Sequence, residues 1–218
     1  MSAALLAVVV LATSCARDDL DTRAVRAAVV TIEAEGCSLV ASRGVGVVVG
    51  DQGMIVTVAH TIAGATRITV VDDQGLDHRA TVRWFDPEAD MAILKIGDFP
   101  APGLQLARAR QGRRAVILTT RTGFGTIGVS ATVEKFITVT IEDIYRDKIA
   151  TRSAMELHAQ IRKGDSGAGV VDDAGRVVGI VYANSRQRPG VAFALDDTEI
   201  RRAVESVGSG PVANGRCA

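Results

Sequence analysis

The chain has no excess of charge of either sign, because 25 lysines and arginines balance 25 aspartates and glutamates among its 218 residues. It also has no long run of like charges and no obvious internal repeat. A basic excess is what usually attracts nucleic acid or an anionic membrane surface. We therefore expect no nucleic-acid partner, and membrane contact only through a lipid anchor at the N-terminus.

Histidine and cysteine are both scarce, with three of each. The histidines are His60, His78 and His158, and no two of them have the spacing of metal ligands. We therefore predict no metal and no cofactor. Of the three, His78 and His158 are expected to be structural or exposed.

Cys15 follows an apolar run at residues 3–12. Ten residues are too few to span a bilayer, but they suit the central region of a signal peptide, and Ala12 and Ser14 fit a cleavage site of small residues. The run therefore predicts export to the periplasm, the cell envelope or the medium. Two fates of Cys15 stay open: removal of residues 1–15 as a signal peptide, or acylation of the cysteine as in a lipoprotein.

The other two cysteines are Cys37 and Cys217. In an exported chain, two remaining cysteines favour a disulfide, which here would tie the C-terminal tail to the first strands. Because a sequence does not show whether two cysteines lie within bonding distance, two free thiols remain the alternative.

Short apolar segments separated by turn residues recur along the chain, and its 22 glycines favour turns and hence β structure. The first set of predicted strands covers residues 28–33, 44–50, 54–59, 67–71, 80–85 and 91–96. The second set covers residues 115–120, 127–133, 136–141, 155–159, 170–171, 177–182 and 191–195. The last segment, 196–207, has apolar residues at helical spacing and acidic residues in its first turn, which predicts a helix.

The two sets of strands are divided by the stretch FPAPG at residues 99–103. Many short strands at this spacing are typical of barrels or sandwiches, and two sets favour two barrels. The predicted organisation is a signal segment (1–15), a linker (16–24), an N-terminal β-barrel (25–110), a C-terminal β-barrel with a helix (111–207) and a tail (208–218).

Ser166 lies in RKGDSGAGVV, a stretch that concentrates glycines around one hydroxyl. All three histidines precede it, whereas an α/β-hydrolase needs its histidine after the nucleophile, so that fold is excluded for Ser166. The orders His-Asp-Ser and Asp-His-Ser survive. His60 ends an apolar strand and Asp90 begins a buried one, where a carboxylate is shielded from water. Asp86, the rival acid, is interpreted as a turn residue.

Three motifs, TVAHT at 57–61, DMAILKI at 90–96 and GDSGAGVV at 164–171, resemble the His, Asp and Ser motifs of chymotrypsin-fold serine proteases. The resemblance is closest to compact bacterial trypsin-like enzymes of the HtrA type, and it covers most of residues 25–205. It implies an all-β fold of two antiparallel six-stranded β-barrels with a short C-terminal helix and an active site between the barrels. HtrA-type proteins usually carry a PDZ domain after the protease, but the dozen or so residues after the last predicted helix are too few for one.

The resemblance also implies a role for each residue of the three motifs. Ser166 is the nucleophile, His60 its general base and acid, and Asp90 the carboxylate that orients the histidine. A serine hydroxyl is a weak nucleophile until a base of the right tautomer activates it, and a buried carboxylate keeps the histidine in that tautomer. The backbone N–H groups of Gly164 and Ser166 would form the oxyanion hole.

Substrate specificity is also expected from the resemblance. It places the pocket floor at Gln160, the wall at Tyr182, Ala183 and Asn184, and Gly190 and Val191 opposite. None of these residues is acidic, which argues against Lys or Arg at the cleavage site and favours a small or medium apolar residue.

The sequence departs from animal trypsin-like enzymes at Asp165, the residue before the nucleophile. In those enzymes a newly exposed N-terminus pairs with this aspartate, and no cleavage sequence of that kind precedes the first barrel here. We therefore expect Asp165 to pair with a side chain, such as an arginine; the alternative is that it faces solvent. The predicted function is a serine endopeptidase acting on proteins or peptides. The alternative is a catalytically silent protein of the same fold that binds them.

Overall fold

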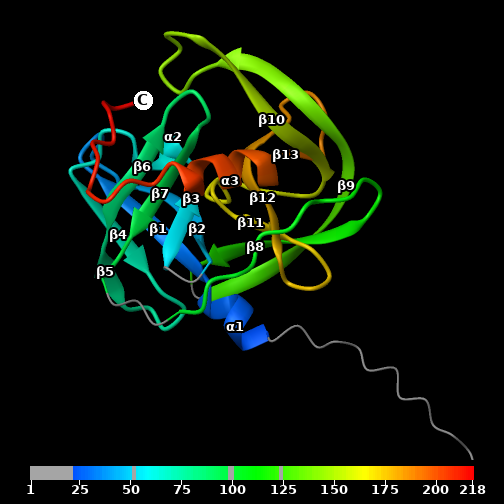
Figure 1. The fold of residues 1–218 in the computed structure, drawn as a ribbon, viewed down its shortest axis with the longest axis horizontal. Coiled ribbons are helices and arrows are strands. Elements are labelled where there is room, and N and C mark those ends of the chain that lie inside the picture. The colour runs from blue at the N-terminus through cyan, green and yellow to red at the C-terminus, as the bar shows by residue number, and fades with distance from the viewer. Residues whose placement is uncertain (1–21, 51–52, 98–100, 123–124) are drawn as a thin grey trace, which may run out of the picture.

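The computed structural model describes residues 22–50, 53–97, 101–122 and 125–218, in which the strands form two sheets packed side by side (Figure 1). The predicted signal segment, including Cys15, and most of the predicted linker lie outside the described residues. A short helix, α1 (Thr22–Ala27), leads into the first sheet where the sequence predicted the end of a linker. In the described part of the chain, no helix is long and apolar enough to cross a membrane.

The first sheet is antiparallel and has the order β5-β4-β1-β2-β3-β7-β6. Its strands are β1 (Val29–Glu35), β2 (Ser42–Val49), β3 (Met54–Thr57), β4 (Arg67–Val71), β5 (Asp77–Arg79), β6 (Thr81–Asp86) and β7 (Met91–Lys95). The two edge strands, β5 and β6, are separated by Ala80 alone, so one bent strand joins the two edges. Counted in this way, the sheet is the six-stranded barrel that the resemblance implied.

The second sheet is a closed barrel of six antiparallel strands in the order β10-β13-β12-β11-β8-β9. Its strands are β8 (Arg114–Arg121), β9 (Gly125–Glu142), β10 (Ile149–His158), β11 (Gly169–Val171), β12 (Val177–Asn184) and β13 (Val191–Asp196). Together the two sheets confirm the predicted fold class.

Strand β9 is continuous over 18 residues, where the sequence predicted two strands, 127–133 and 136–141. The polar residues between them do not end the strand. Leu157 of β10 pairs with Val133 and Glu156 pairs with Lys135, which leaves Glu134 as the extra residue of a β-bulge. Across the bulge, β9 and β10 continue as a long hairpin that extends beyond the second barrel (Figure 1), and near its tip the N–H of Ile144 donates to the carbonyl oxygen of Pro87 at 3.3 Å.

Helix α3 (Asp197–Glu205) lies within the predicted helix and packs where the barrels meet (Figure 1). Asp196 caps it by accepting a hydrogen bond of 3.0 Å from the backbone N–H of Thr198. Ile200 and Ala203 are fully buried. The helix contacts β7 of the first barrel and β12 and β13 of the second, and so holds the two together.

The C-terminal tail is fastened to the first barrel. A disulfide joins Cys37, in the loop after β1, to Cys217, 180 residues later. The side-chain amide of Asn214 donates to the carbonyl oxygens of Ile62 and Ala65 at 2.7 and 2.9 Å. The tail therefore packs beside the short helix α2 (Ala59–Ile62), which carries His60.

Candidate active site

His60 and Asp90 meet on the N-terminal barrel. The sequence predicted His60 at a strand end, but β3 stops at Thr57 and His60 lies in the helical turn α2. The ring Nδ1 lies 2.9 and 3.0 Å from the two carboxylate oxygens of Asp90, and the backbone N–H of His60 donates to Asp90 Oδ1 at 3.0 Å. These contacts fix both the position and the orientation of the imidazole.

Asp90 immediately precedes β7 and has an unusual backbone conformation, with φ of 54°. A non-glycine residue in the left-handed region is strained and is kept only where its surroundings enforce it. Only 4% of Asp90 is exposed to solvent. Asp86 instead accepts hydrogen bonds from the backbone N–H groups of Glu88 and Ala89, as expected of a turn residue.

The pKa of His60 reflects opposing effects. Burial alone would lower it, because a charged imidazolium is poorly solvated there. The hydrogen bond and the negative charge of Asp90 outweigh burial and raise the pKa above its usual value, while the positive charge of Arg152 works against them. A histidine in this setting can take up a proton during a reaction and release it again.

Ser166 lies in the turn that precedes β11 on the C-terminal barrel, and both barrels hold it. Its carbonyl oxygen accepts a hydrogen bond of 2.8 Å from the backbone N–H of Val45 in β2, and the next N–H, of Gly167, donates to Val181 in β12 at 2.8 Å. Gly167 has φ of 87°, and a β-carbon there would overlap the carbonyl oxygen of Val45. Only glycine allows the serine turn to approach β2 this closely.

The serine turn also approaches helix α2. A β-carbon added to Gly44 would lie 2.9 Å from both the carbonyl oxygen of Ser166 and the hydroxyl oxygen of Thr61, the residue after His60. The turn and the helix therefore meet at Gly44. Within the described residues no hydrogen bond joins His60 to Ser166. Such bonds are often long without substrate.

The backbone N–H groups of Gly164 and Ser166 have no acceptor among the residues that the structure describes. Gly164 has φ of 94°, a conformation that glycine adopts without strain, and no atom would contact a β-carbon there. Two unpaired donors on either side of Asp165 leave room for a negatively charged oxygen next to the serine.

Asp165 is completely buried and pairs with Arg121, which confirms the expectation of an arginine partner. The guanidinium of Arg121 donates to both carboxylate oxygens, and the hydroxyl of Thr119 and the backbone N–H of Arg162 also donate to them. Burial alone would raise the pKa of Asp165, but these bonds and the charge of Arg121 hold it below its usual value. The ion pair fastens the serine turn to β8.

The predicted specificity residues lie in two places. Tyr182, Ala183 and Asn184 line a cavity of about 620 Å³ together with apolar side chains of β9 and β13, among them Val139, Ile141 and Phe193. Gln160 and Gly190 lie beside each other, since a β-carbon at Gly190 would be 3.4 Å from Nε2 of Gln160. Arg186 also lines the cavity. Arg188 does not, and its guanidinium donates two hydrogen bonds of 2.7 Å to the carboxylate of Glu156.

The lining from β9 was missed by the sequence analysis, because the predicted strand break hid how far this hairpin extends. Val139 and Ile141 alternate with threonines along β9, which was the available signal. The other two histidines are placed as expected. His78 binds Asp72 at 2.8 Å, and His158 is exposed.

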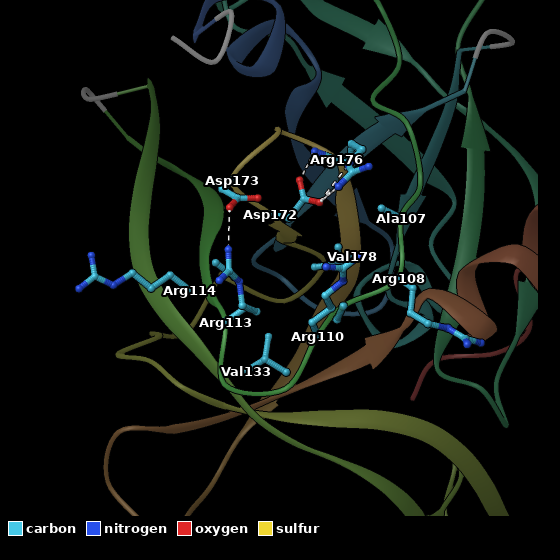
Figure 2. Close-up of a pocket in the computed structure, with 12 residues that line it drawn as sticks. Ala107, Arg108, Arg110, Arg113, Arg114, Val133, Asp172, Asp173, Arg176 and Val178 are labelled. Carbon is cyan, nitrogen blue, oxygen red and sulfur yellow. Dashed lines mark hydrogen bonds and ion pairs between the residues drawn. The ribbon is translucent and has the colours of Figure 1, made fainter. Parts of the chain in front are cut away.

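A second cavity, of about 330 Å³, lies at the far end of β11 from Ser166 (Figure 2). Arginines dominate its lining, but Arg176 and Arg113 are paired with Asp172 and Asp173. The side chain of Arg114 extends away from this pair of aspartates (Figure 2). None of the predicted site residues lines this cavity, so it is separate from the candidate active site.

Comparison with known proteins agrees with this fold and site. Residues 44–180 match the family described as the trypsin-like peptidase domain. The match covers more than half of the chain, and the chain therefore belongs to this family.

Among its relatives is a protein named Serine protease Rv3671c of Mycobacterium tuberculosis (strain ATCC 25618 / H37Rv), which is 31% identical over 168 residues. That alignment covers 75% of this chain and 42% of the relative. Another, from Brucella suis biovar 1 (strain 1330), is named "Probable periplasmic serine endoprotease DegP-like"; it is 27% identical over 76% of this chain and 33% of its own length. The chain thus spans less than half the length of these relatives.

Solved structures give the same picture. The active form of the Rv3671c protease from M. tuberculosis superposes with a TM-score of 0.83 at 29% identity, over 90% of this chain and 88% of that one. The inactive form gives a TM-score of 0.73 over 86% of this chain and 92% of that one, at 30% identity. An HtrA-type protease, AlgWS227A with a tripeptide, gives 0.74 at 25% identity, over 88% of this chain and 64% of its own.

Proposed function

We propose that the protein is a serine endopeptidase that hydrolyses peptide bonds through Ser166, His60 and Asp90 and an acyl-enzyme intermediate. The observation that carries the proposal is the geometry of His60, whose Nδ1 and backbone N–H are both fastened to the buried Asp90. A carboxylate on Nδ1 leaves Nε2 of the neutral ring free to accept a proton, as the general base of a serine nucleophile requires.

Each step of the reaction has its group in the chain. His60 takes the proton of Ser166 as the hydroxyl attacks the substrate carbonyl, and the imidazolium that forms is stabilised by Asp90. The negative oxygen of the tetrahedral intermediate is bound by the N–H groups of Gly164 and Ser166. His60 then gives its proton to the leaving amine, which leaves the acyl-enzyme. In the second half of the reaction His60 takes a proton from water, the water attacks the acyl carbon, and His60 returns the proton to Ser166 as the acid product leaves. The greater similarity to the active than to the inactive form of the Rv3671c protease supports this arrangement.

The substrates are proteins or peptides, and the side chain at the cleavage site is small or medium and apolar. No acidic residue is present among Gln160, Tyr182, Ala183, Asn184 and Gly190, so a basic side chain would find no counter-charge there. The apolar side chains on the lining of the cavity beside Tyr182 suit further apolar side chains of a bound peptide, although the lining also carries charges of both signs, from Glu142, Asp143, Arg146 and Arg186. The tripeptide in the AlgWS227A structure supports a peptide ligand for this family.

The protein acts outside the cytoplasm, as a secreted, periplasmic or envelope-attached enzyme, with Cys15 either removed or acylated. The apolar run at residues 3–12 supports export. The disulfide between Cys37 and Cys217 supports it independently, because disulfides persist mainly in oxidising compartments.

Hydrolysis of a mixed peptide library tests the proposed function. The full chain is expected to cleave after small and medium apolar residues, with products read by mass spectrometry. Ser166→Ala is expected to lower kcat by at least about 10⁴-fold, because no other group can form the acyl-enzyme. Ser130→Ala, which removes an exposed hydroxyl from β9, is the matched control and should cleave at the wild-type rate. A wild-type protein that binds peptides without turnover would instead support a silent binding protein.

A further inference from the structure

Arg152 is a charged residue buried at the junction of the barrels, and no step described above uses it. It lies in β10, and only 3% of it is exposed. Burying an unpaired guanidinium costs several kcal/mol, so its partners have to compensate for the lost water. These partners show what the residue does.

The partners of Arg152 come from both barrels. Its Nε donates to the carbonyl oxygen of Glu88 at 2.6 Å, and Nη2 donates to the carbonyl oxygen of Glu142 at 3.4 Å. Its Nη1 lies 3.9 Å from Oδ2 of Asp90. The central carbon of the guanidinium, Cζ, lies over the ring of Tyr182 at 5.9 Å from its centre. A planar group with fixed donors is therefore held in one orientation, with its charge next to the aspartate that orients His60.

We infer that Arg152 is a positioning residue of the Ser-His-Asp site, which holds Asp90 turned toward His60 and places a fixed positive charge beside that carboxylate. The inference rests on the proposed function, because it concerns the same reaction. It adds a residue of the second barrel to a pair that the first barrel supplies.

Orientation is the first part of this role. Asp90 Oδ1 accepts from the backbone N–H of His60, while Oδ2 lies between Nδ1 of His60 and Nη1 of Arg152. The carboxylate is thus held from both sides, and its strained backbone is supported by an ion pair to a strand of the other barrel. The carbonyl of Glu88, two residues earlier, binds the same guanidinium and fixes the turn that precedes Asp90.

Charge is the second part. Three titratable groups face Arg152 or its carboxylate partner: Asp90 and His60 from the first barrel and Tyr182 from the second. Glu88 and Glu142 turn their backbone carbonyls toward Arg152, and the carboxylate of Glu88 binds Lys148 at 3.1 Å instead. The pKa of Tyr182 is raised, mainly by burial, so its phenol stays neutral. Arg152 is therefore the positive charge that offsets Asp90 at His60.

The charge of Arg152 affects the pH at which the protein becomes active. Hydrolysis needs neutral His60, so the acidic limb of a pH profile of kcat/KM reports protonation of its ring. Removing the positive charge of Arg152 makes the imidazolium more stable and raises the pKa of His60 further. The variant then needs a higher pH before its base is free, so the acidic limb moves to higher pH.

The experiment compares pH profiles of Arg152→Lys and Arg152→Gln in the full chain, with folding checked by circular dichroism at each pH. Both replacements can donate hydrogen bonds to the two carbonyls, but only lysine keeps the charge. We expect Arg152→Gln to move the acidic limb to higher pH and to lower kcat about ten- to a hundredfold through misplacement of Asp90. Arg152→Lys should keep the limb near its wild-type position.

A matched control and a distinct failure complete the test. Arg114→Gln removes an exposed arginine remote from the site and should leave the profile unchanged. A folded Arg152→Gln protein with an unmoved acidic limb would overturn the inference and leave a purely structural role.

If neither replacement at Arg152 retains the folded spectrum, a second experiment uses Tyr182→Leu. The titration of the His60 ring is then followed by NMR in this variant and in the wild-type protein. Loss of the stacking ring should loosen Arg152 and raise the pKa of His60, and an unchanged titration would overturn the inference. A wild-type protein without any hydrolysis is the different result that contradicts the proposed function.

Discussion

Asp90→Asn is expected to lower kcat by about 10⁴-fold while KM stays close to its wild-type value. The carboxylate of Asp90 accepts from both the ring Nδ1 and the backbone N–H of His60. An amide offers one oxygen acceptor, and its NH₂ group would face the ring and donate to Nδ1. That reversal places the ring proton on Nε2. A protonated Nε2 of the neutral ring cannot accept the proton of Ser166. Substrate binding uses other residues and should not change.

Steady-state kinetics on a cleaved reporter peptide measure this loss, and Asp86→Asn is the control. Asp86 is four residues away in the same turn and holds only backbone N–H groups. An amide oxygen can still accept from these, so kcat should stay within a few-fold of wild type. Equal losses in the two variants, or an Asp90→Asn protein within tenfold of wild type, would show that Asp90 does not orient the base.

Arg121→Met is expected to destabilise the protein by about 3 kcal/mol at pH 7 and to lower kcat about a hundredfold or more. The variant leaves Asp165 buried without a counter-charge, next to Ser166. The same carboxylate accepts from the N–H of Arg162 at 2.7 Å, so any shift of Asp165 would also move the turn that carries Gly164. The matched control is Arg114→Met at the exposed start of β8, which should cost almost no stability.

The pH dependence of stability distinguishes this mechanism from a general packing defect. In the wild type the pKa of Asp165 is lowered, so its contribution to stability is present above its unfolded pKa and is lost as pH falls through the folded one. In Arg121→Met the charge and the bonds of Arg121 no longer oppose burial, while the bonds from Thr119 and Arg162 remain, so the folded pKa of Asp165 is higher than in the wild type and the variant loses less stability as pH falls. Urea unfolding should therefore show the gap between wild type and variant shrinking toward acid pH.

A double variant completes this test. Asp165→Asn combined with Arg121→Met removes both charges. The double variant should therefore lose less stability than the two single variants lose together. A gap independent of pH, together with additive losses, would contradict the assigned role of the ion pair.

The fold was largely predictable because glycines and turn residues separate short apolar segments along most of the chain. The errors come from tertiary structure. TVAHTI is as apolar as a strand, yet the chain leaves the sheet at Thr57 and coils into α2, where Asp90 binds the backbone N–H of His60. A contact with a residue 30 positions away decided this conformation, and no local pattern encodes it.

The candidate site was predictable to the extent that its residues lie in motifs. The position of all three histidines before Ser166 excluded an α/β-hydrolase, and the lack of an N-terminal partner for Asp165 favoured a side-chain partner such as an arginine. Arg152 could not be found in this way, since it stands between Thr151 and Ser153 in a polar stretch. Its importance arises from a bond to Glu88, 64 residues away on the other barrel.

The central claim is that Ser166 is an activated nucleophile, and a fluorophosphonate probe tests it most directly. The full chain is incubated with the probe, and its intact mass and the modified peptide are measured. We predict a single adduct on Ser166 that is absent from Ser166→Ala and from His60→Ala, because the hydroxyl reacts only when the imidazole accepts its proton. A folded wild-type protein without an adduct, or an adduct that persists in Ser166→Ala, would contradict the account.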